Sequence, residues 1–205
     1  MTDRLLLRMY TPEDADGLFR AVNESRDTLL PWLPWVPTAH RTIYETIYDI
    51  ERFRRDVDPW TERTNLVLGV FRRDTGEIVG GNGFHTLRLA TSQAEIGYWT
   101  HERHRRQGYC TEATRWMISW MLTPRERALR GGDGCEVPGW GLRRVEILAA
   151  GGNVASCAVP RRIGLREEMR RVEHTWLDGA GWQDMLCWGV LAREWDFIRH
   201  APAGR

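Results

Sequence analysis

The sequence predicts a mixed α/β (α+β) protein in which a central sheet of about seven strands is flanked by helices. Seven apolar stretches have strand length, and longer stretches repeat their apolar residues at helical spacing. One run, residues 94–122, joins a strand to a helix through an arginine-rich loop. With 205 residues, the chain is long enough for a single domain, residues 1–205, with its own core.

The N-terminal part predicts a strand and two helices. Residues 4–10 alternate leucine or methionine with arginine, as a half-buried strand does. Thr11 then supplies a capping hydroxyl, Pro12 suits the first helical position, and the acids after them complement the helix dipole. Helical spacing of isoleucines predicts a second amphipathic helix over about 41–55.

Between these two helices, residues 29–35 read LLPWLPW, which is too rich in proline for a regular element. Trp32 and Trp35 either anchor this loop by burying their rings or line the pocket of a substrate. The residues alone leave both interpretations open.

Six further strands follow, each bounded by turn residues. They are expected at residues 65–72, 78–87, 94–99, 144–149, 170–177 and 182–191. The sequence DGAG at 178–181 predicts a hairpin between the last two, and residues 192–198 predict a final amphipathic turn. Residues 123–142 are rich in glycine, arginine and proline without periodicity, so we expect an irregular insertion there.

Composition excludes several classes of protein. The formal net charge of +1 argues against nucleic-acid binding by bulk electrostatics. The four cysteines contain no CxxC pair, and HERH at 101–104 is one residue short of HExxH and lies in a loop, so we expect no metal. No apolar run reaches the roughly 18 residues of a membrane span. We expect a cytoplasmic protein that does not bind a membrane.

The stretch from strand 94–99 to helix 108–122 has the features of an anion site. The first N–H groups of a helix have no partner within the helix, and the macrodipole adds positive charge there. Gly108 allows the backbone to approach a phosphate closely. Arg103, Arg105 and Arg106 add full charges, so the loop suits a pyrophosphate.

Residues 105–110, RRQGYC, resemble the R/Q-x-x-G-x-G/A acyl-CoA signature of the GNAT superfamily of N-acetyltransferases. The wider pattern EIGYW…GYxTEA is similar to the RimJ/RimL type, which acetylates ribosomal-protein N-termini. Cys110 departs from the glycine or alanine of the signature and could crowd the pyrophosphate. The resemblance implies the GNAT fold, whose sheet is twisted, mixed and mostly antiparallel, and it implies a homodimer as one assembly.

A second landmark, Asn153 to Ser156 followed by RIGLREE, resembles the family's N-x-x-S segment. The resemblance implies that Asn153 binds the pantetheine arm and that Ser156 approaches the thioester sulfur; the alternative is that both merely cap a helix. Pro160 stands where many members carry the tyrosine that protonates the leaving thiolate. Ser156 or water would then be the acid.

The implied cofactor is acetyl-CoA, without a metal. The residues expected to bind it are Ile96, Gly97, Tyr98, Trp99, Arg103, Arg105, Arg106, Gln107, Gly108, Tyr109, Cys110, Thr111, Asn153 and Ser156. The residues expected at the acceptor site are Trp32, Trp35, His85 and Glu95, although His85 also fits a core or rim position.

Acyl transfer needs a base, a stabilised oxyanion and a proton for the leaving thiol. Glu95 is the expected base, and a backbone N–H where strand 94–99 splays from its neighbour would hold the oxyanion. The alternative is that Glu95 is a surface strand residue or the partner of an arginine. Ser156 is the second expected catalytic residue.

The leading hypothesis is transfer of acetyl from acetyl-CoA to a primary amine, the N-terminal α-amine of a protein or peptide, by direct attack in a ternary complex. An α-amine is roughly 15% neutral at pH 7 and a lysine about 0.04%, so an α-amine tolerates a weak base. The alternatives are a small-molecule amine, such as an antibiotic or an amino-acid-like metabolite, and a non-catalytic acyl-CoA-binding module.

Overall fold

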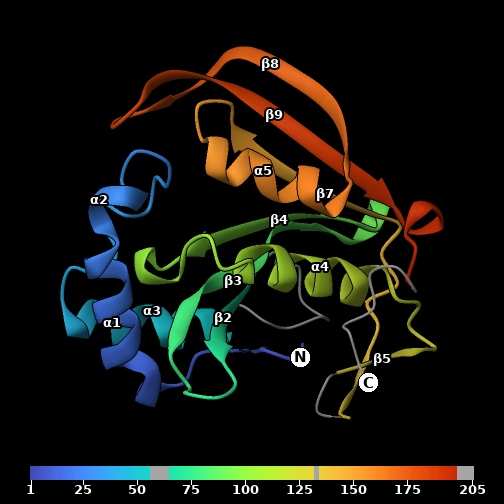
Figure 1. The fold of residues 1–205 in the computed structure, drawn as a ribbon, viewed down its shortest axis with the longest axis horizontal. Helices are drawn as coiled ribbons and strands as arrows, with labels where there is room; N and C mark the ends of the chain where they lie inside the picture. Colours follow the sequence, from blue (N-terminus) through green and yellow to red (C-terminus); the bar gives the residue numbers. More distant parts are fainter. Residues whose placement is uncertain (56–64, 132–133, 198–205) are drawn as a thin grey trace.

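The computed structural model describes residues 1–55, 65–131 and 134–197. Its centre is a seven-stranded sheet in the order β1-β2-β3-β4-β7-β9-β8, which confirms the predicted fold class (Figure 1). The strands are β1 (Leu5–Arg8), β2 (Leu66–Arg72), β3 (Ile78–Arg88), β4 (Gln93–Thr100), β7 (Arg144–Ala150), β8 (Arg166–Leu177) and β9 (Gly181–Leu191).

All neighbouring strands of this sheet are antiparallel except β4 and β7, which are parallel. The mixed, mostly antiparallel sheet is therefore confirmed. Helix α4 (Tyr109–Leu122) and a hairpin of β5 (Ala128–Arg130) and β6 (Glu136–Pro138) connect the two parallel strands, because parallel neighbours require a long crossover.

Helices cover both faces of the sheet, and the sheet separates two hydrophobic cores. Helices α1 (Ala15–Glu24) and α3 (Ile43–Arg55) pack over β2 and β3, where Leu18, Ile50 and Phe71 are buried. Helices α4 and α5 (Val154–Ile163) cover the other face, around Met117 and Trp188. Figure 1 shows α4 and α5 side by side with β4 behind them.

The expected helix after Thr11 is present, and it begins with one 3₁₀ turn, Pro12–Asp14. The Asp14 carboxylate accepts the Thr11 backbone N–H at 2.7 Å and two bonds from Arg8 at 2.6 and 2.8 Å. These bonds join β1 to the start of α1. Pro12 and the acids lie in the first turn, as predicted, while the Thr11 hydroxyl donates to the Asp14 carboxylate at 3.2 Å.

The proline-rich loop forms turns, as predicted, after the short helix α2 (Arg26–Leu29), which the sequence did not reveal. Arg26 holds the loop by donating to the backbone carbonyls of Val36, Ala39 and His40. The loop also reaches the far end of the sheet, because Pro31 packs against the backbone of Gly179 in the β8–β9 hairpin.

The prediction that residues 123–142 are irregular throughout is wrong in part. They contain a small antiparallel hairpin, β5 (Ala128–Arg130) paired with β6 (Glu136–Pro138). The indole N–H of Trp120 donates to the Pro138 carbonyl at 2.9 Å, so helix α4 supports the hairpin. Strands of three residues are too short to show an alternation in the sequence.

The closing hairpin is confirmed, and β8 starts four residues before its predicted position. A 3₁₀ turn, Ala192–Glu194, follows β9, while Ile198 of the predicted final turn lies outside the described residues. Among the helices of the described chain, none is long and apolar enough to cross a membrane.

Candidate functional site

The central feature of the site is a fork between β4 and β7. The two strands pair only at Gln93 with Arg144, Ala94 with Val145 and Glu95 with Glu146. From Ile96 onward, β4 has no partner on this side within the described sheet, while β7 continues to pair with β9. The splay expected from the sequence is present, and it leaves one edge of β4 with unpaired backbone groups.

The loop that follows β4 turns sharply into α4. Arg106 and Gly108 both have left-handed backbone conformations, with φ of 62° and 81°. Gly108 caps the helix, and its carbonyl accepts the Glu112 N–H at 3.0 Å. The strain at Arg106, which has a side chain, suggests a functional constraint on the loop.

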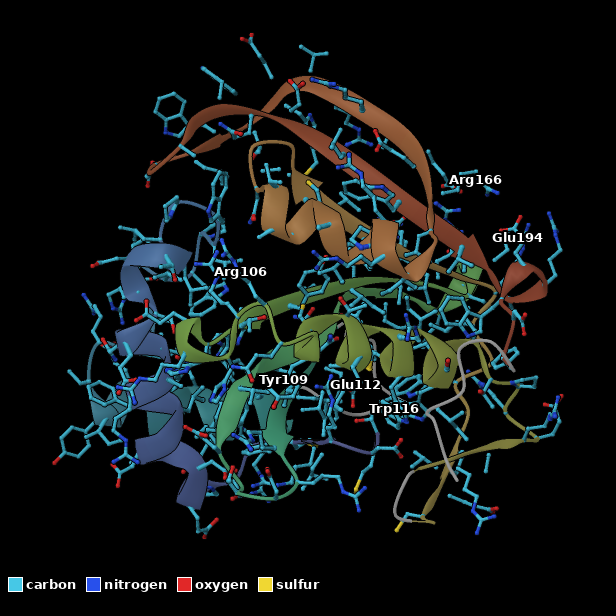
Figure 2. All side chains as sticks on the ribbon, in the orientation of Figure 1. Arg106, Tyr109, Glu112, Trp116, Arg166 and Glu194 are labelled. Atoms are coloured by element: carbon cyan, nitrogen blue, oxygen red, sulfur yellow. The ribbon has the colours of Figure 1, made fainter. Side chains whose placement is uncertain are left out.

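The backbone N–H groups of residues 106–111 find no acceptor among the described residues. They form the cradle of amides that an anion would occupy at a helix N-terminus. A Cβ built on Gly108 would meet only the Arg4 guanidinium, at 3.5 Å, so the approach to the loop is open. The side chains of Arg105 and Arg106 are exposed and add positive charge there. Figure 2 labels Arg106 in the loop before α4.

Arg4, the residue before β1, supports this loop. Its guanidinium donates to the Gln107 carbonyl at 3.2 Å, lies 4.7 Å from the centre of the Tyr109 ring and pairs with Glu112 at 2.5 Å. The Gln107 side chain also donates to the Arg103 carbonyl at 3.1 Å. The loop is therefore held in shape without using its free amides.

Helix α1 holds the beginning of the same loop. Glu24 lies 3.1 Å from His101 Nε2 and 3.1 Å from Arg103 Nε. His101 and His104 are buried with their rings 5.4 Å apart, and His104 lies 3.4 Å from Glu77. These histidines support the loop, and the described residues contain no group of three or more metal-ligating side chains.

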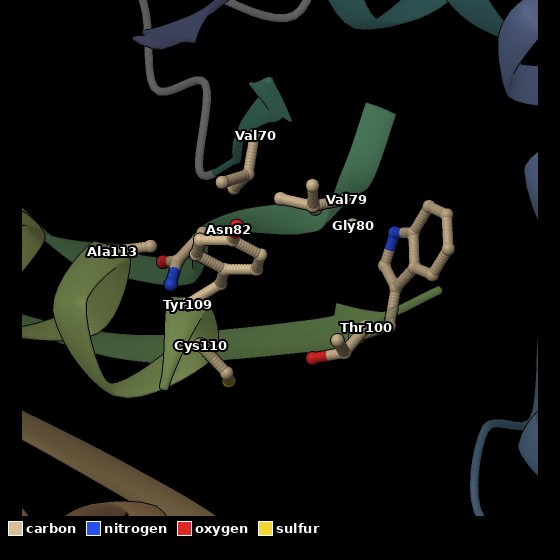
Figure 3. A pocket seen from close by; sticks show the side chains of 10 residues that line it. Val70, Val79, Gly80, Asn82, Thr100, Tyr109, Cys110 and Ala113 are labelled. Carbon is tan, nitrogen blue, oxygen red and sulfur yellow. The ribbon is translucent and has the colours of Figure 1, made fainter. Parts of the chain in front are cut away.

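Cys110 lines a cavity of about 10 Å³ beneath the first turn of α4, together with Asn82 and Thr100 (Figure 3). Its thiol has hydrogen bonds with Thr100 and Thr114, and burial raises its pKa to about 11. Cys110 is half-buried, and its thiol lies near enough to Tyr98 to add to the effect of burial in raising the pKa of that phenol, so crowding of the pyrophosphate by this side chain stays a prediction. The cavity is about the size of one water molecule. The side-chain oxygen Oδ1 of Asn82 has no hydrogen-bond partner among the described residues.

On the other side of the fork, Asn153 caps helix α5 by accepting the Ser156 N–H at 3.1 Å. The Tyr98 hydroxyl donates to the Ser156 carbonyl at 2.9 Å, and the Ser156 hydroxyl lies 3.5 Å from the Tyr98 oxygen. Tyr98 therefore bridges the fork from β4 to α5. Pro160 is buried inside α5.

The face of β4 that points away from α5 forms the candidate acceptor side. His85 lies at a bulge in β3 and is exposed, with its ring over Gly97, where a Cβ would lie 2.2 Å from Nε2. Protein atoms around the ring lower the pKa of His85. The Trp99 indole covers Gly81 and meets the Trp35 ring at 6.5 Å.

The loop carrying Trp32 closes one end of this side. A Cβ on Gly152 would lie 3.3 Å from the Trp32 ring, so the ring reaches the turn between β7 and α5. Trp32 and Trp35 are both half-buried. Both rings therefore anchor the loop, and Trp35 also contacts Trp99 on β4; a role of either ring in an acceptor pocket stays a prediction.

Glu95 stands at the vertex of the fork. Burial raises its pKa, the charge of Glu146 raises it further, and Arg88 opposes both effects. Glu146 itself is held by Arg88 at 3.5 Å and by Arg144 at 3.3 Å. Two carboxylates in such proximity, with the charged partners concentrated on one of them, favour a proton-accepting role for the other.

The structure gathers most of the predicted residues around the fork but directs several side chains elsewhere. Ile96 is buried in the core, Tyr109 packs beneath the loop, and Arg103 is paired with Glu24. The Trp99 ring contacts Trp35 on the candidate acceptor side, so its predicted contact with the cofactor stays a prediction. These residues can still meet a ligand through their backbone, whereas Arg105, Arg106 and Thr111 remain accessible.

Arg4 and Glu146 lie at the site but were not among the residues expected from the sequence. Arg4 is about 100 residues from the loop it supports, and no local pattern connects them. Glu146 is a half-buried residue of β7, where buried apolar residues alternate with half-buried ones, and a carboxylate in such a strand was the available signal.

The comparisons with known proteins agree with this geometry. The family model described as an acetyltransferase (GNAT) domain matches residues 4–166. A putative ribosomal N-acetyltransferase of Bacillus subtilis (strain 168), YdaF, is 28% identical over 198 residues, 96% of each chain. An uncharacterized N-acetyltransferase of the same organism, YoaA, is 32% identical over 167 residues, 82% of each chain.

Solved structures share the fold. A crystal structure of a probable acetyltransferase has a TM-score of 0.77 and 26% identity, covering 94% of this chain and 96% of the other. A RimL ribosomal L7/L12 α-N-protein acetyltransferase in complex with coenzyme A has a TM-score of 0.73 and 20% identity, covering 92% and 94%.

Proposed function

The chain belongs to the GNAT family of acetyltransferases, and from this premise we propose that its acceptor is the N-terminal α-amine of a protein or peptide. It is an acetyl-CoA-dependent N-acetyltransferase. The observation that supports the proposal most strongly is the fork, where an open edge of β4 ends at Glu95.

The coenzyme would be held by groups that the protein leaves free. The amides of residues 106–111 and the Arg105 and Arg106 side chains suit its pyrophosphate. The unpaired edge of β4 from Ile96 onward offers N–H and C=O groups to an amide-containing chain. Asn153 would contribute its side-chain NH₂, because its oxygen is used in capping α5.

Glu95 would accept the proton that the amine loses, directly or through water. A carboxylate whose pKa is raised by burial is a better base than an exposed one. The exposed His85 ring, which lies over Gly97 on the same side of β4, is the second group that would face the acceptor. An N-terminal α-amine needs a weaker base than a lysine amine does, because the α-amine is already partly neutral at pH 7.

Direct attack in a ternary complex is supported by the state of the cysteines nearest the fork. Burial raises the pKa of Cys110 and of Cys157, and the Cys157 thiol donates to the Ala150 carbonyl at 3.4 Å. A thiol must be deprotonated to act as a nucleophile. We therefore infer that no acyl-cysteine forms on the path.

The similarity to YdaF, a putative ribosomal N-acetyltransferase, supports an α-amine of a ribosomal protein as the acceptor class. The two chains match over 96% of their lengths, so the similarity includes the loop and the hairpin that border the acceptor side. A protein N-terminus is extended and needs an open approach, which the exposed His85 and half-buried Trp32 provide.

The experiment is an acceptor panel with acetyl-CoA, read by mass spectrometry because the exposed Cys135 would react with thiol dyes. The panel contains short peptides with a free N-terminus, the same peptides with a blocked N-terminus and a lysine, aminoglycosides and free amino acids. We expect acetylation of the free-N-terminus peptides alone. Acetylation restricted to a small amine would contradict the acceptor class, and coenzyme binding without turnover on any amine would contradict catalysis.

A further inference from the structure

Transfer of the acetyl group requires an acid that the sequence did not identify. The amine nitrogen attacks the thioester carbonyl, a C–N bond forms, and the C–S bond breaks with its electron pair left on sulfur. The nitrogen loses one proton to the base, and the sulfur must gain one. The buried Pro160, at the position expected for an acid, carries no proton to give.

Tyr98 carries a hydroxyl beside the unpaired edge of β4. It is on β4, three residues beyond the last β4–β7 pair, and its hydroxyl crosses the fork to the Ser156 carbonyl at 2.9 Å. The Ser156 hydroxyl lies 3.5 Å from the Tyr98 oxygen, on the helix whose N-terminus borders the fork. The two hydroxyl groups therefore face each other across the gap between β4 and α5.

Other proton donors near the fork are directed elsewhere. The Cys157 thiol is bound to the Ala150 carbonyl on the inner side of α5. The Cys110 thiol already has hydrogen bonds with Thr100 and Thr114, although it lies near enough to Tyr98 to add to the effect of burial in raising the pKa of that phenol. Among these groups, Tyr98 and Ser156 are the pair whose hydroxyls border the fork.

We propose that Tyr98 is the general acid that protonates the leaving thiolate, and that the Ser156 hydroxyl stabilises the phenolate by donating to it. The proposal rests on the proposed function, because it assumes that a thioester lies along the free edge of β4. The phenol O–H bond breaks as the S–H bond forms, and the phenolate then regains a proton from solvent. Tyr98 on β4 would thus supply the phenol hydroxyl that is missing at position 160 on α5, where this chain has proline.

Burial raises the pKa of Tyr98, which at first sight makes it a poor acid. The same burial disfavours a thiolate beside it, because both groups are charged only when deprotonated. The acidity of the phenol relative to the thiol is therefore closer to that of the free groups, whose pKa values are about 10 and about 8.5. Moving the negative charge between adjacent buried atoms avoids the cost of creating a new buried ion.

The first test is Tyr98→Phe, which removes the hydroxyl and keeps the ring. We expect kcat to fall about 100-fold, within the range of general acid catalysis, while KM for acetyl-CoA changes less than about threefold. Tyr10→Phe is the matched control, since Tyr10 is also buried and donates to a backbone carbonyl, that of Gly80, at 3.2 Å. It should leave kcat nearly unchanged.

The second test separates an acid from a structural bridge. Replacing Tyr98 by 3,5-difluorotyrosine keeps the hydroxyl, and hence the contact with Ser156, but makes the phenol more acidic. The alkaline limb of the kcat–pH profile should move to lower pH than in the wild type, because the more acidic phenol loses its proton at a lower pH. A structural bridge would leave that limb where it is.

The assay uses whichever primary amine the wild-type protein acetylates, so the acceptor class and the acid are tested separately. Equal kcat for Tyr98→Phe and the wild type would overturn the role of Tyr98. So would an unchanged alkaline limb in the fluorinated protein. Thermal unfolding and coenzyme binding of each variant show whether a lost activity reflects a lost fold, in which case the fluorinated protein decides.

Discussion

Glu95 and Glu146 form the last pair of residues that joins β4 to β7, and the strands part immediately beyond them. Residues paired directly across a sheet have their side chains on the same face. The charge of Glu146 therefore acts on Glu95, while Arg88 and Arg144 neutralise Glu146. This arrangement places one poised carboxylate at the vertex of the fork.

Glu95→Gln removes the proposed base with little change in shape. We expect kcat to fall tenfold or more, since a positioned base contributes about 10² to 10⁴ in rate, and KM for acetyl-CoA to stay nearly constant. Steady-state kinetics on the acetylated acceptor measures both. Glu136→Gln, on the exposed strand β6, is the matched control. Unchanged kcat for Glu95→Gln would remove Glu95 from the role of base.

Glu146→Gln removes the neighbouring negative charge. The pKa of Glu95 is raised by burial and then by Glu146, so the substitution lowers that pKa. Because the base works in its ionised form, the acid limb of the kcat profile should move to lower pH. A pH profile of both proteins measures the shift. A limb that stays in place, or moves to higher pH, would show that Glu146 does not act on the base.

Gly108→Ala tests the turn into α4. Gly108 has φ of 81°, a conformation that costs a residue with a side chain about 1 kcal/mol or more. We expect KM for acetyl-CoA to rise about tenfold, which corresponds to about 1.4 kcal/mol. Gly76→Ala is the control, because Gly76 has φ of 72° and no atom within 4 Å of the added Cβ.

Both glycine variants should lose similar thermal stability, while Gly108→Ala alone weakens coenzyme binding. Titration calorimetry with CoA and thermal unfolding of the two variants make the comparison. If Gly76→Ala weakened binding to the same degree, the effect would be one of global stability and the loop would not be the anion site.

Glu168→Gln tests an ion pair that joins β8 to β7. The hydrogen bond from Arg144 lowers the pKa of Glu168, and Arg166 adds to the effect at 2.8 Å. A carboxylate with a lowered folded-state pKa stabilises the fold above its unfolded value of about 4.3, and this contribution disappears as pH falls through the folded value.

We therefore expect Glu168→Gln to cost about 1 kcal/mol of unfolding free energy at pH 7 and less at pH 3. Urea unfolding of both proteins at the two pH values measures the difference. An equal loss of unfolding free energy at pH 7 and pH 3 would show that packing, and not the charge of Glu168, stabilises the fold here.

The elements of the fold followed from local patterns in the sequence. Apolar alternation located β1, Gly108 marked the start of α4, and DGAG marked the β8–β9 turn, because each depends on residues within one turn or strand. The hairpin β5–β6 was missed since its strands are three residues long. Helix α2 was missed for a similar reason, being four residues long.

The site was predictable in its coenzyme loop and less so in its chemistry. The loop is contiguous, whereas the bridge between Tyr98 and Ser156 joins residues 58 positions apart. The direction of the Cys110 side chain depends on Thr100 and Thr114, which lie on two different elements. Such contacts form only when the sheet and both helices are assembled, so no sequence spacing encodes them.

The account depends most on the free amides between Arg106 and Thr111, which are assigned to the pyrophosphate of the coenzyme. A crystal structure of the protein with bound CoA tests this assignment directly. We predict the pyrophosphate within hydrogen-bond distance of these amides and the pantetheine arm along β4 beyond Glu95. A CoA molecule bound elsewhere, with the amides turned to solvent or closed by the loop itself, would contradict the account.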